Sequence, residues 1–181
     1  MKATGIVRRI DDLGRVVVPK EIRRTLRLRE GTPLEIFTDR EGEIILKKYS
    51  PMAEMGTFAR QYAEALNQTT GLAVCITDRD QVIAVAGAKK ELMQKPISKG
   101  LEQMILNRES GIAAKEDRRF VQVAEGDKEE YTAQTVQIIL SEGDAIGAVI
   151  LLSKEARARM GDTEQKLAAT AASFLGRQME A

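Results

Sequence analysis

The 181-residue sequence predicts two domains: a mostly β N-terminal domain with the order β-β-α-β-β, and an α+β C-terminal domain flanked by helices. Two observations predict this division. Residues 1–50 hold short Val- and Ile-rich segments separated by turns, which is typical of hairpins. Residues 51–181 place apolar strand-like segments between two long helical patterns, which is typical of a sheet backed by helices.

Composition limits the class of protein. Hydrophobic residues make up 43% and charged residues 30% of the chain, as in globular proteins. No apolar run approaches the ~18 residues of a membrane span, and the N-terminus has no apolar signal core. Because Cys75 is the only cysteine, no internal disulfide can form. We therefore expect a cytoplasmic protein.

The chain contains no histidine, which removes the commonest general acid–base and the commonest metal ligand. A Ser-His-Asp or Cys-His nucleophile cannot be built, and a structural zinc site lacks ligands. Neither a GxxxxGK[ST] phosphate loop nor a GxGxxG turn after a strand is present. We expect no catalytic residues, no metal and no tightly bound cofactor.

The first half of the N-terminal domain reads as a hairpin followed by a short helix. Residues 5–10 and 15–19 are rich in Val and Ile and flank the polar turn at 11–14, which ends in Gly. Pro19 ends the second strand because it has no N–H for a ladder. Residues 20–26 then form a helix, with Pro19 suited to its start.

The second half reads as another strand pair. Residues 33–38 alternate apolar and polar side chains, residues 39–42 form a turn, and residues 43–49 return as a strand. Four strands and one short helix bury too little apolar surface to be stable alone. We therefore expect a dimer in which two copies share one core.

Basic residues crowd into positions 1–29, where nine Lys or Arg face three acids and give a formal charge of +6, against +1 for the whole chain. Such a concentration is typical of nucleic-acid binding. The alternative is an ordinary solvated charged face. The basic residues are Lys2, Arg8, Arg9, Arg15, Lys20, Arg23, Arg24, Arg27 and Arg29.

The residues that carry a family resemblance are KATGIVRRIDDLGRVVVPKEIRRTL at 2–26, PLEIF at 33–37 and IILKKY at 44–49. They resemble the swapped-hairpin DNA-binding domain of the AbrB family of transition-state regulators. The resemblance implies that two chains interleave their hairpins into one dimer that binds double-stranded DNA. It places the DNA-contacting arginines at Arg8, Arg15, Arg23 and Arg24, with Lys2 and Arg9 nearby.

Arginine suits this task because its guanidinium binds phosphate or a guanine edge through two parallel hydrogen bonds. A short helix cannot fill a groove, so we expect few base contacts and much readout of DNA shape.

Two helical patterns frame the C-terminal domain. The first covers residues 51–68, with Ser50 and Pro51 at its start and a heptad-like seam of Met52, Met55, Ala59, Tyr62 and Leu66. The second begins at Asp162, a candidate N-cap with Gln165 three residues on. These helices pack either between subunits or on the sheet of their own domain.

The segments between the helices predict an antiparallel sheet with one more helix. The predicted helix covers 99–108. Gly147, inside the last strand, marks a bulge or a close backbone approach. The predicted strands are 72–77, 82–86, 120–124, 131–140 and 145–152.

Residues 74–78 (VCITD), 82–87 (VIAVAG) and 146–152 (IGAVILL) resemble a GAF-type sensory domain. No ligand signature is present, and Cys75 reads as a small core residue.

An AbrB-type domain joined to a GAF-like domain at this length resembles a family of sporulation regulators. That resemblance implies a homotetramer that activates and represses genes in the forespore. The leading hypothesis is a DNA-binding regulator controlled by a small molecule; the alternative is a C-terminal domain that only joins subunits. An antitoxin with a disordered tail is disfavoured because the second half should fold, and an enzyme is disfavoured because no catalytic set emerges.

Overall fold

The computed structural model describes residues 4–49, 56–128 and 130–180. The chain divides into two compact units, residues 1–49 and residues 50–181, and each is described by itself.

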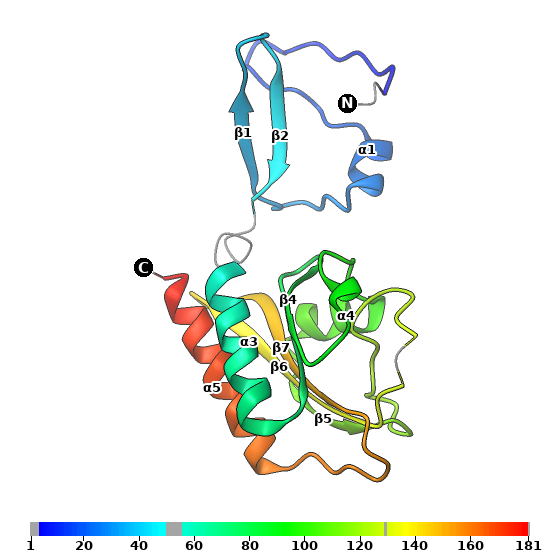
Figure 1. Ribbon diagram of the computed structural model, residues 1–181. Helices are drawn as coiled ribbons and strands as arrows, with labels where there is room; N and C mark the ends of the chain where they lie inside the picture. Colours follow the sequence, from blue (N-terminus) through cyan, green and yellow to red (C-terminus); the bar gives the residue numbers. More distant parts are fainter. Residues whose placement is uncertain (1–3, 50–55, 129, 181) are drawn as a thin grey trace. The chain divides into compact units, whose positions relative to one another are not determined.

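The elements of residues 4–49 are a helix and a hairpin (Figure 1), namely α1 Lys20–Thr25, β1 Leu34–Thr38 and β2 Ile44–Lys48. The strands β1 and β2 pair antiparallel, with Leu34 opposite Lys48 and Thr38 opposite Ile44. Asp39 shapes the turn between them because its Oδ1 accepts hydrogen bonds from the N–H groups of Glu41 and Glu43. This part agrees with the sequence prediction.

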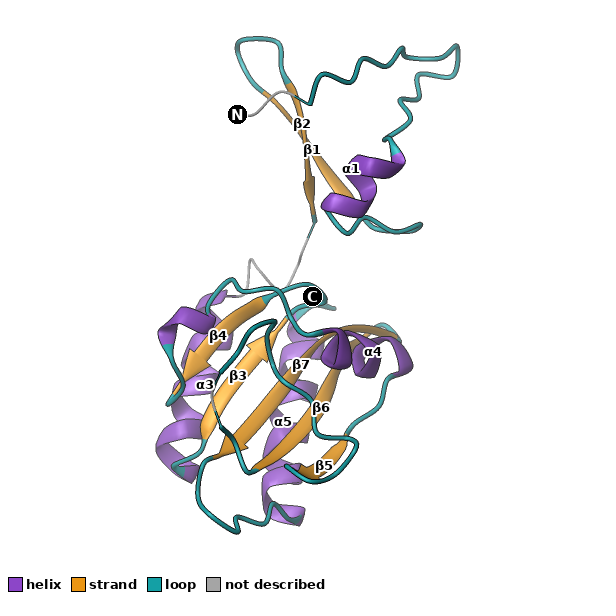
Figure 2. Ribbon diagram, turned by 90° about the vertical axis from the view of Figure 1, so that its right-hand side faces the viewer, coloured by secondary structure: helices purple, strands orange, loops and turns teal. Residues whose placement is uncertain are grey.

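The segments predicted as the first two strands, 5–10 and 15–19, differ from that expectation. They are drawn as loop in Figure 2, and no ladder forms on them among the described residues of this single chain. The turn between them does form, because Asp11 N donates to Arg15 O and Gly14 N donates to Asp11 O, both at 3.0 Å. A strand needs a neighbouring strand to bond its backbone, and these segments find none within the unit.

The N-terminal unit has almost no core. Among residues 4–49 only Pro19 is buried. Val7 is 84% and Val17 70% exposed. Ten more large apolar side chains of this unit are also exposed: Ile6, Ile10, Leu13, Val16, Leu26, Ile36, Phe37, Ile44, Leu46 and Tyr49.

The C-terminal unit is a five-stranded antiparallel sheet with the order β4-β3-β7-β6-β5. Helices α3 and α5 cover one face, and α4 lies on the other (Figures 1 and 2). The elements are α3 Gly56–Thr70, β3 Ala73–Thr77, β4 Val82–Ala86, the 3-10 turn η1 Lys90–Leu92, α4 Lys99–Asn107, β5 Gly111–Ala114, β6 Ala133–Ser141, β7 Asp144–Ser153 and α5 Asp162–Gln178.

Two apolar cores lie on opposite faces of this sheet. Strand β3 is buried along its whole length and serves both, since Cys75 belongs to the core under α4 whereas Val74 and Ile76 belong to the core under α3 and α5. Alternation of side chains along a strand produces this division.

Close backbone approaches occur at two glycines. A Cβ at Gly147 would lie 2.0 Å from the carbonyl oxygen of Thr77, so the predicted close approach is confirmed. A Cβ at Gly176 of α5 would lie 2.0 Å from the carbonyl oxygen of Leu140, next to a register shift in the β6–β7 ladder.

The C-terminal helices pack on the sheet of their own domain. Ala59 and Leu66 of the predicted seam are buried there, together with Ala168 and Leu175 of α5. The rings of Tyr62 and Phe174 also join α3 to α5, with centroids 5.3 Å apart. The inter-subunit alternative is therefore wrong for the buried positions, while Met52 and Met55 of the seam, with Ser50 and Pro51, lie outside the described residues.

Two local predictions in this unit need correction, and one strand was missed. Residues 120–124 form no strand. Strand β5 was not predicted at all. Helix α5 begins at the predicted residue, but its N-cap is Gly161 instead of Asp162, and Glu164 takes the place expected for Gln165 by accepting a hydrogen bond from Gly161 N at 2.7 Å.

In the segment at 120–124 Val123 and Ala124 are buried although no strand forms, and side chains bond part of its backbone. With its amide oriented to meet both groups, Gln134 Nε2 donates to Val121 O at 2.8 Å and Oε1 accepts from Val121 N at 2.9 Å. Ser98 Oγ donates to Gln122 O at 2.5 Å. Backbone groups bond the rest, since Ser98 N donates to Val123 O at 3.0 Å and Ile97 forms an isolated bridge with Ala124.

Candidate nucleic-acid interface

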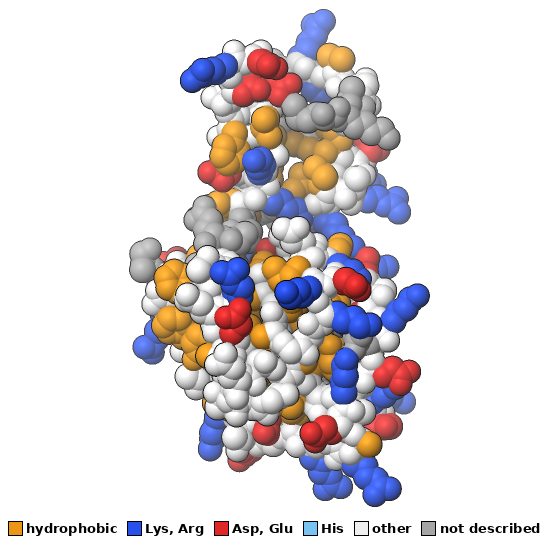
Figure 3. Space-filling view, in the orientation of Figure 1, with side chains coloured by type: hydrophobic (Ala, Val, Ile, Leu, Met, Phe, Trp, Pro, Cys, Tyr) orange, Lys and Arg blue, Asp and Glu red, His pale blue; other side chains and the backbone are white. Residues whose placement is uncertain are grey.

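The structure places the predicted DNA-contacting arginines on three consecutive segments of the N-terminal unit. Arg8 and Arg9 lie in the extended segment before the 11–14 turn, Arg15 directly follows that turn, and Arg23 and Arg24 lie in the last turn of α1. All five are exposed, whereas Lys2 lies outside the described residues. Figure 3 shows Lys and Arg side chains projecting from this unit.

Arg15 is the arginine whose surroundings are most closely defined. Its Nε donates to Asp11 Oδ2 at 2.8 Å, and its backbone N–H donates to Asp11 Oδ1 at 2.7 Å. Leu13 N donates to the same Oδ1 at 3.0 Å. The backbone hydrogen bond from Arg15, and then the one from its side chain, hold the pKa of Asp11 below its usual value. Gly14 supplies the positive φ of 74° that closes the turn.

The sequence prediction assigned Asp11 only to the turn and missed it as a partner of Arg15. The available signal was the spacing itself, because an acid four residues before an arginine, with a Gly between them, is folded back onto it by a tight turn.

Arg23 and Arg24 are held by the local structure of α1. Arg23 N donates to Pro19 O at 2.9 Å at the start of the helix, and Leu28 N donates to Arg23 O at 2.7 Å beyond its end. The turn after the helix passes through Arg27, whose φ of 53° is left-handed. The short helix thus presents two adjacent guanidinium groups between fixed ends.

Chemically, these groups are permanent cations. A guanidinium stays protonated at any physiological pH and presents donors in a planar fork that matches phosphate or guanine. Exposure of all five leaves them accessible to a polyanion. The arrangement can bind a nucleic-acid backbone and offers no nucleophile or general base for catalysis among these five residues.

An acidic trio at the β1–β2 turn is the arrangement nearest to a cation site among the described residues. Oxygens of Asp39, Glu41 and Glu43 lie within 4.8 Å of one another. Asp39 Oδ1 already accepts backbone hydrogen bonds at 3.0 and 2.9 Å. The carboxylate of Asp39 is therefore explained by the turn that it stabilises.

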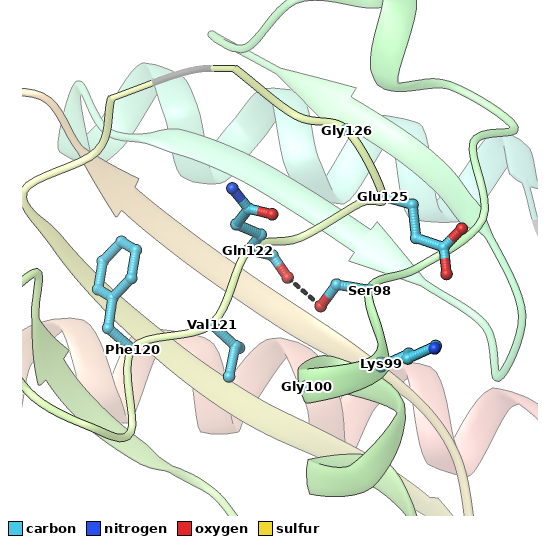
Figure 4. Close-up of a pocket in the computed structure, with 8 residues that line it drawn as sticks. All are labelled: Ser98, Lys99, Gly100, Phe120, Val121, Gln122, Glu125 and Gly126. Carbon is cyan, nitrogen blue, oxygen red and sulfur yellow. Dashed lines mark hydrogen bonds between the residues drawn. The ribbon is translucent and has the colours of Figure 1, made fainter.

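A hollow of about 420 Å³ lies beside the N-terminus of α4 in the C-terminal unit (Figure 4). Ser98 caps this helix by accepting a hydrogen bond from Leu101 N at 3.1 Å. The lining is mixed: Ser98, Lys99, Gly100, Phe120, Val121, Gln122, Glu125 and Gly126. It offers one ammonium and one carboxylate beside an aromatic ring.

Cys75 is a core residue, as the sequence predicts. It is fully buried in the core under α4. Burial, and after it the charge of Asp127, raises the pKa of the thiol to about 12. The thiol is therefore neutral and inert at physiological pH.

No helix in the described parts of the chain combines the length and the apolar character that crossing a membrane requires.

The chain resembles known proteins over its whole length. It is 56% identical over 181 residues to stage V sporulation protein T of Bacillus subtilis (strain 168), covering 99% of both chains. Residues 54–180 match the family described as "Stage V sporulation protein T C-terminal, transcription factor". Residues 7–54 match the family "Antidote-toxin recognition MazE, bacterial antitoxin".

Each unit also has its own relatives. The chain is 63% identical over 51 residues to the transition state regulatory protein AbrB of B. subtilis, which is 28% of this chain and 52% of that one. The fold of the C-terminal unit is that of the GAF domain from Acinetobacter phosphoenolpyruvate-protein phosphotransferase, with a TM-score of 0.59, 12% identity and coverage of 74% of this chain and 84% of that chain. The chain thus joins an AbrB-like domain to a GAF-like domain and belongs to the family of stage V sporulation protein T.

Proposed function

We propose that the protein regulates transcription by binding double-stranded DNA as a dimer of its N-terminal units. Arg8, Arg15, Arg23 and Arg24 contact the DNA, with Lys2 and Arg9 assisting. The observation that carries this proposal is the combination, in residues 4–49, of exposed arginines with a single buried residue, Pro19.

A unit with so little core requires a partner of complementary shape, and a second copy supplies it. The exposed side chains of Val7, Val17 and Ile36 bury apolar surface when two copies interleave. The extended segments 5–10 and 15–19 gain ladder partners from the other copy. Interleaving thereby turns the fold of one chain into the swapped hairpin of the AbrB family.

The family relation supports further roles. We infer that the protein activates some genes and represses others in the forespore cytoplasm, as a homotetramer assembled through its C-terminal helices. Phe58 of α3 and Phe174 of α5 are 52% and 39% exposed and offer apolar surface for that assembly.

A small molecule bound to the GAF-like unit is the proposed regulator. The hollow beside α4, with Lys99 and Glu125 on its lining, is the candidate site. Regulation requires the ligand to favour one arrangement of the DNA-binding units over another. The second candidate function has no ligand, and the C-terminal unit then only joins subunits and raises affinity through multivalency.

Two experiments test these proposals. Alanine variants of the four arginines should stay folded by circular dichroism and lose affinity for a duplex selected from a random library; undiminished affinity in all four refutes the DNA-contact proposal. Calorimetric titration with candidate metabolites, read beside DNA affinity, tests the regulation. Equal DNA affinity with and without a saturating ligand would refute the proposed regulation. The C-terminal unit would then only join subunits.

A further inference from the structure

We propose that Asp11 positions Arg15 for DNA: its carboxylate holds one edge of the guanidinium and leaves the other edge free to bind the duplex. This inference rests on the proposed DNA-binding function and assigns a role to a residue of opposite charge within the same surface.

The contacts define the Arg15 side chain at both of its ends. Asp11 Oδ1 accepts from Arg15 N at 2.7 Å, which fixes the backbone, while Oδ2 accepts from Arg15 Nε at 2.8 Å, which fixes the guanidinium. The same Oδ1 accepts from Leu13 N at 3.0 Å, so the carboxylate itself is oriented by the turn. One carboxylate therefore joins the turn to the cation that follows it.

The remaining edge of Arg15 is available. Among the residues that the structure describes, Nη1 and Nη2 of Arg15 have no hydrogen-bond partner. These two atoms can donate a parallel pair of hydrogen bonds to a phosphate or to a guanine edge. An arginine that is already ordered loses less side-chain entropy on binding than a free one.

Asp12 provides an internal control. It is the next residue, it is exposed, and its carboxylate has no hydrogen bond among the described residues. An acid beside a DNA-binding surface repels phosphate, so removing either aspartate should tighten binding if charge alone mattered. If Asp11 positions Arg15, removing the carboxylate of Asp11 should instead weaken DNA binding.

The effect should appear in binding and not in folding. The side chains of Asp11 and Arg15 are 37% and 68% exposed, and solvent-exposed ion pairs contribute little to stability. Asn at position 11 keeps an oxygen that can accept from the backbone, so Asp11→Asn preserves the turn and removes the charged contact to Nε. Asp11→Ala removes both.

The test measures the affinity of the full chain for a fluorescent duplex selected from a random library by the unsubstituted protein. We expect Asp12→Asn to bind equally or more tightly, and Asp11→Asn to bind about three- to tenfold more weakly, the range that ordering one long side chain represents. In an Arg15→Ala background, Asp11→Asn should cause no further loss. Thermal unfolding should match among these variants, and the Nε–H resonance of Arg15 should exchange faster with water in Asp11→Asn.

The outcomes separate the two proposals. If Arg15→Ala binds as tightly as the unsubstituted protein, the assignment of Arg15 to DNA contact fails. If Arg15→Ala weakens binding but Asp11→Asn behaves like Asp12→Asn, the DNA contact stands and positioning is overturned. Positioning is also overturned if Asp11→Asn weakens binding equally with and without Arg15, because the carboxylate then acts through the turn alone.

Discussion

Replacing Gly176 in α5 by Ala should affect stability in two opposite ways, through helix propensity and through packing. Replacing Gly by Ala inside a helix ordinarily stabilises it by about 1 kcal/mol, since Gly loses more backbone entropy on folding. At Gly176 the new Cβ would stand 2.0 Å from the carbonyl oxygen of Leu140, whereas ordinary contacts begin at 3.4 Å. The helix must therefore move away from β6 by about 1 Å or more.

The size of the stability loss in Gly176→Ala depends on that movement of the helix. Forcing extra volume into a packed core costs about 1–3 kcal/mol, occasionally more. Leu175, the residue before Gly176, is fully buried, and Glu142 N donates to Glu180 Oε1 at 3.1 Å, so a shift of the helix end disturbs packing and a hydrogen bond together. After subtraction of the propensity gain, Gly176→Ala should lower stability by up to about 2 kcal/mol, which corresponds to a fall in Tm of up to roughly 8 °C.

The assay is calorimetry of the full chain at equal concentrations, with Gly56→Ala as the matched control. Gly56 opens α3, and nothing lies within 4 Å of its added Cβ. Gly56→Ala should therefore leave Tm unchanged or raise it. If Gly176→Ala raises Tm as much as Gly56→Ala does, the close approach of α5 to β6 is refuted.

Three further predictions concern binding, assembly and chemistry. Arg8, Arg15, Arg23 and Arg24 make eight arginines per dimer, and if all eight contact phosphates, log K for DNA against log salt should fall with a slope of roughly −7. We expect a slope of about −4 to −7 in fluorescence titrations, and a slope near zero contradicts phosphate contact. A fragment of residues 1–50 should sediment as a dimer at micromolar concentration because Pro19 alone is buried in residues 4–49, and a stable folded monomer would contradict the shared core. Because Cys75 binds its proton more tightly when folded, with a pKa of about 12 against 9.0, its contribution to stability is present below pH 9.0 and is lost as pH rises toward 12. Urea unfolding should show a steeper loss above pH 9.0 than Cys75→Ala shows, and a thiol reagent should label only the unfolded chain; rapid labelling of the folded protein at neutral pH would contradict the burial.

The sequence predicted most strands of the sheet because their segments are rich in apolar and β-branched side chains. Strand β4 occupies its predicted residues, and α3 ends where Gly71 takes a positive φ of 70°. Strand β5 was missed because Gly-Ile-Ala-Ala contains one β-branched residue and pairs only along β6. Such a strand is defined by its neighbour and not by its own pattern.

The prediction of a strand at 120–124 failed for the opposite reason. Its apolar residues indicate burial correctly, since Val123 and Ala124 are buried. Whether a segment is a strand depends on what bonds its backbone, and here the side-chain amide of Gln134 bonds the backbone of Val121. The same limit applied to Asp11, whose role depends on where a turn directs one carboxylate.

Because Pro19 is the one buried residue among residues 4–49, DNA binding by the N-terminal unit should depend on the concentration of the protein. If DNA binding requires two chains, then at low abundance the number of competent dimers grows with the square of the chain concentration. Doubling synthesis then more than doubles the number of dimers at low abundance. Dimerisation thereby gives the regulator a threshold of its own, separate from control through the GAF-like unit.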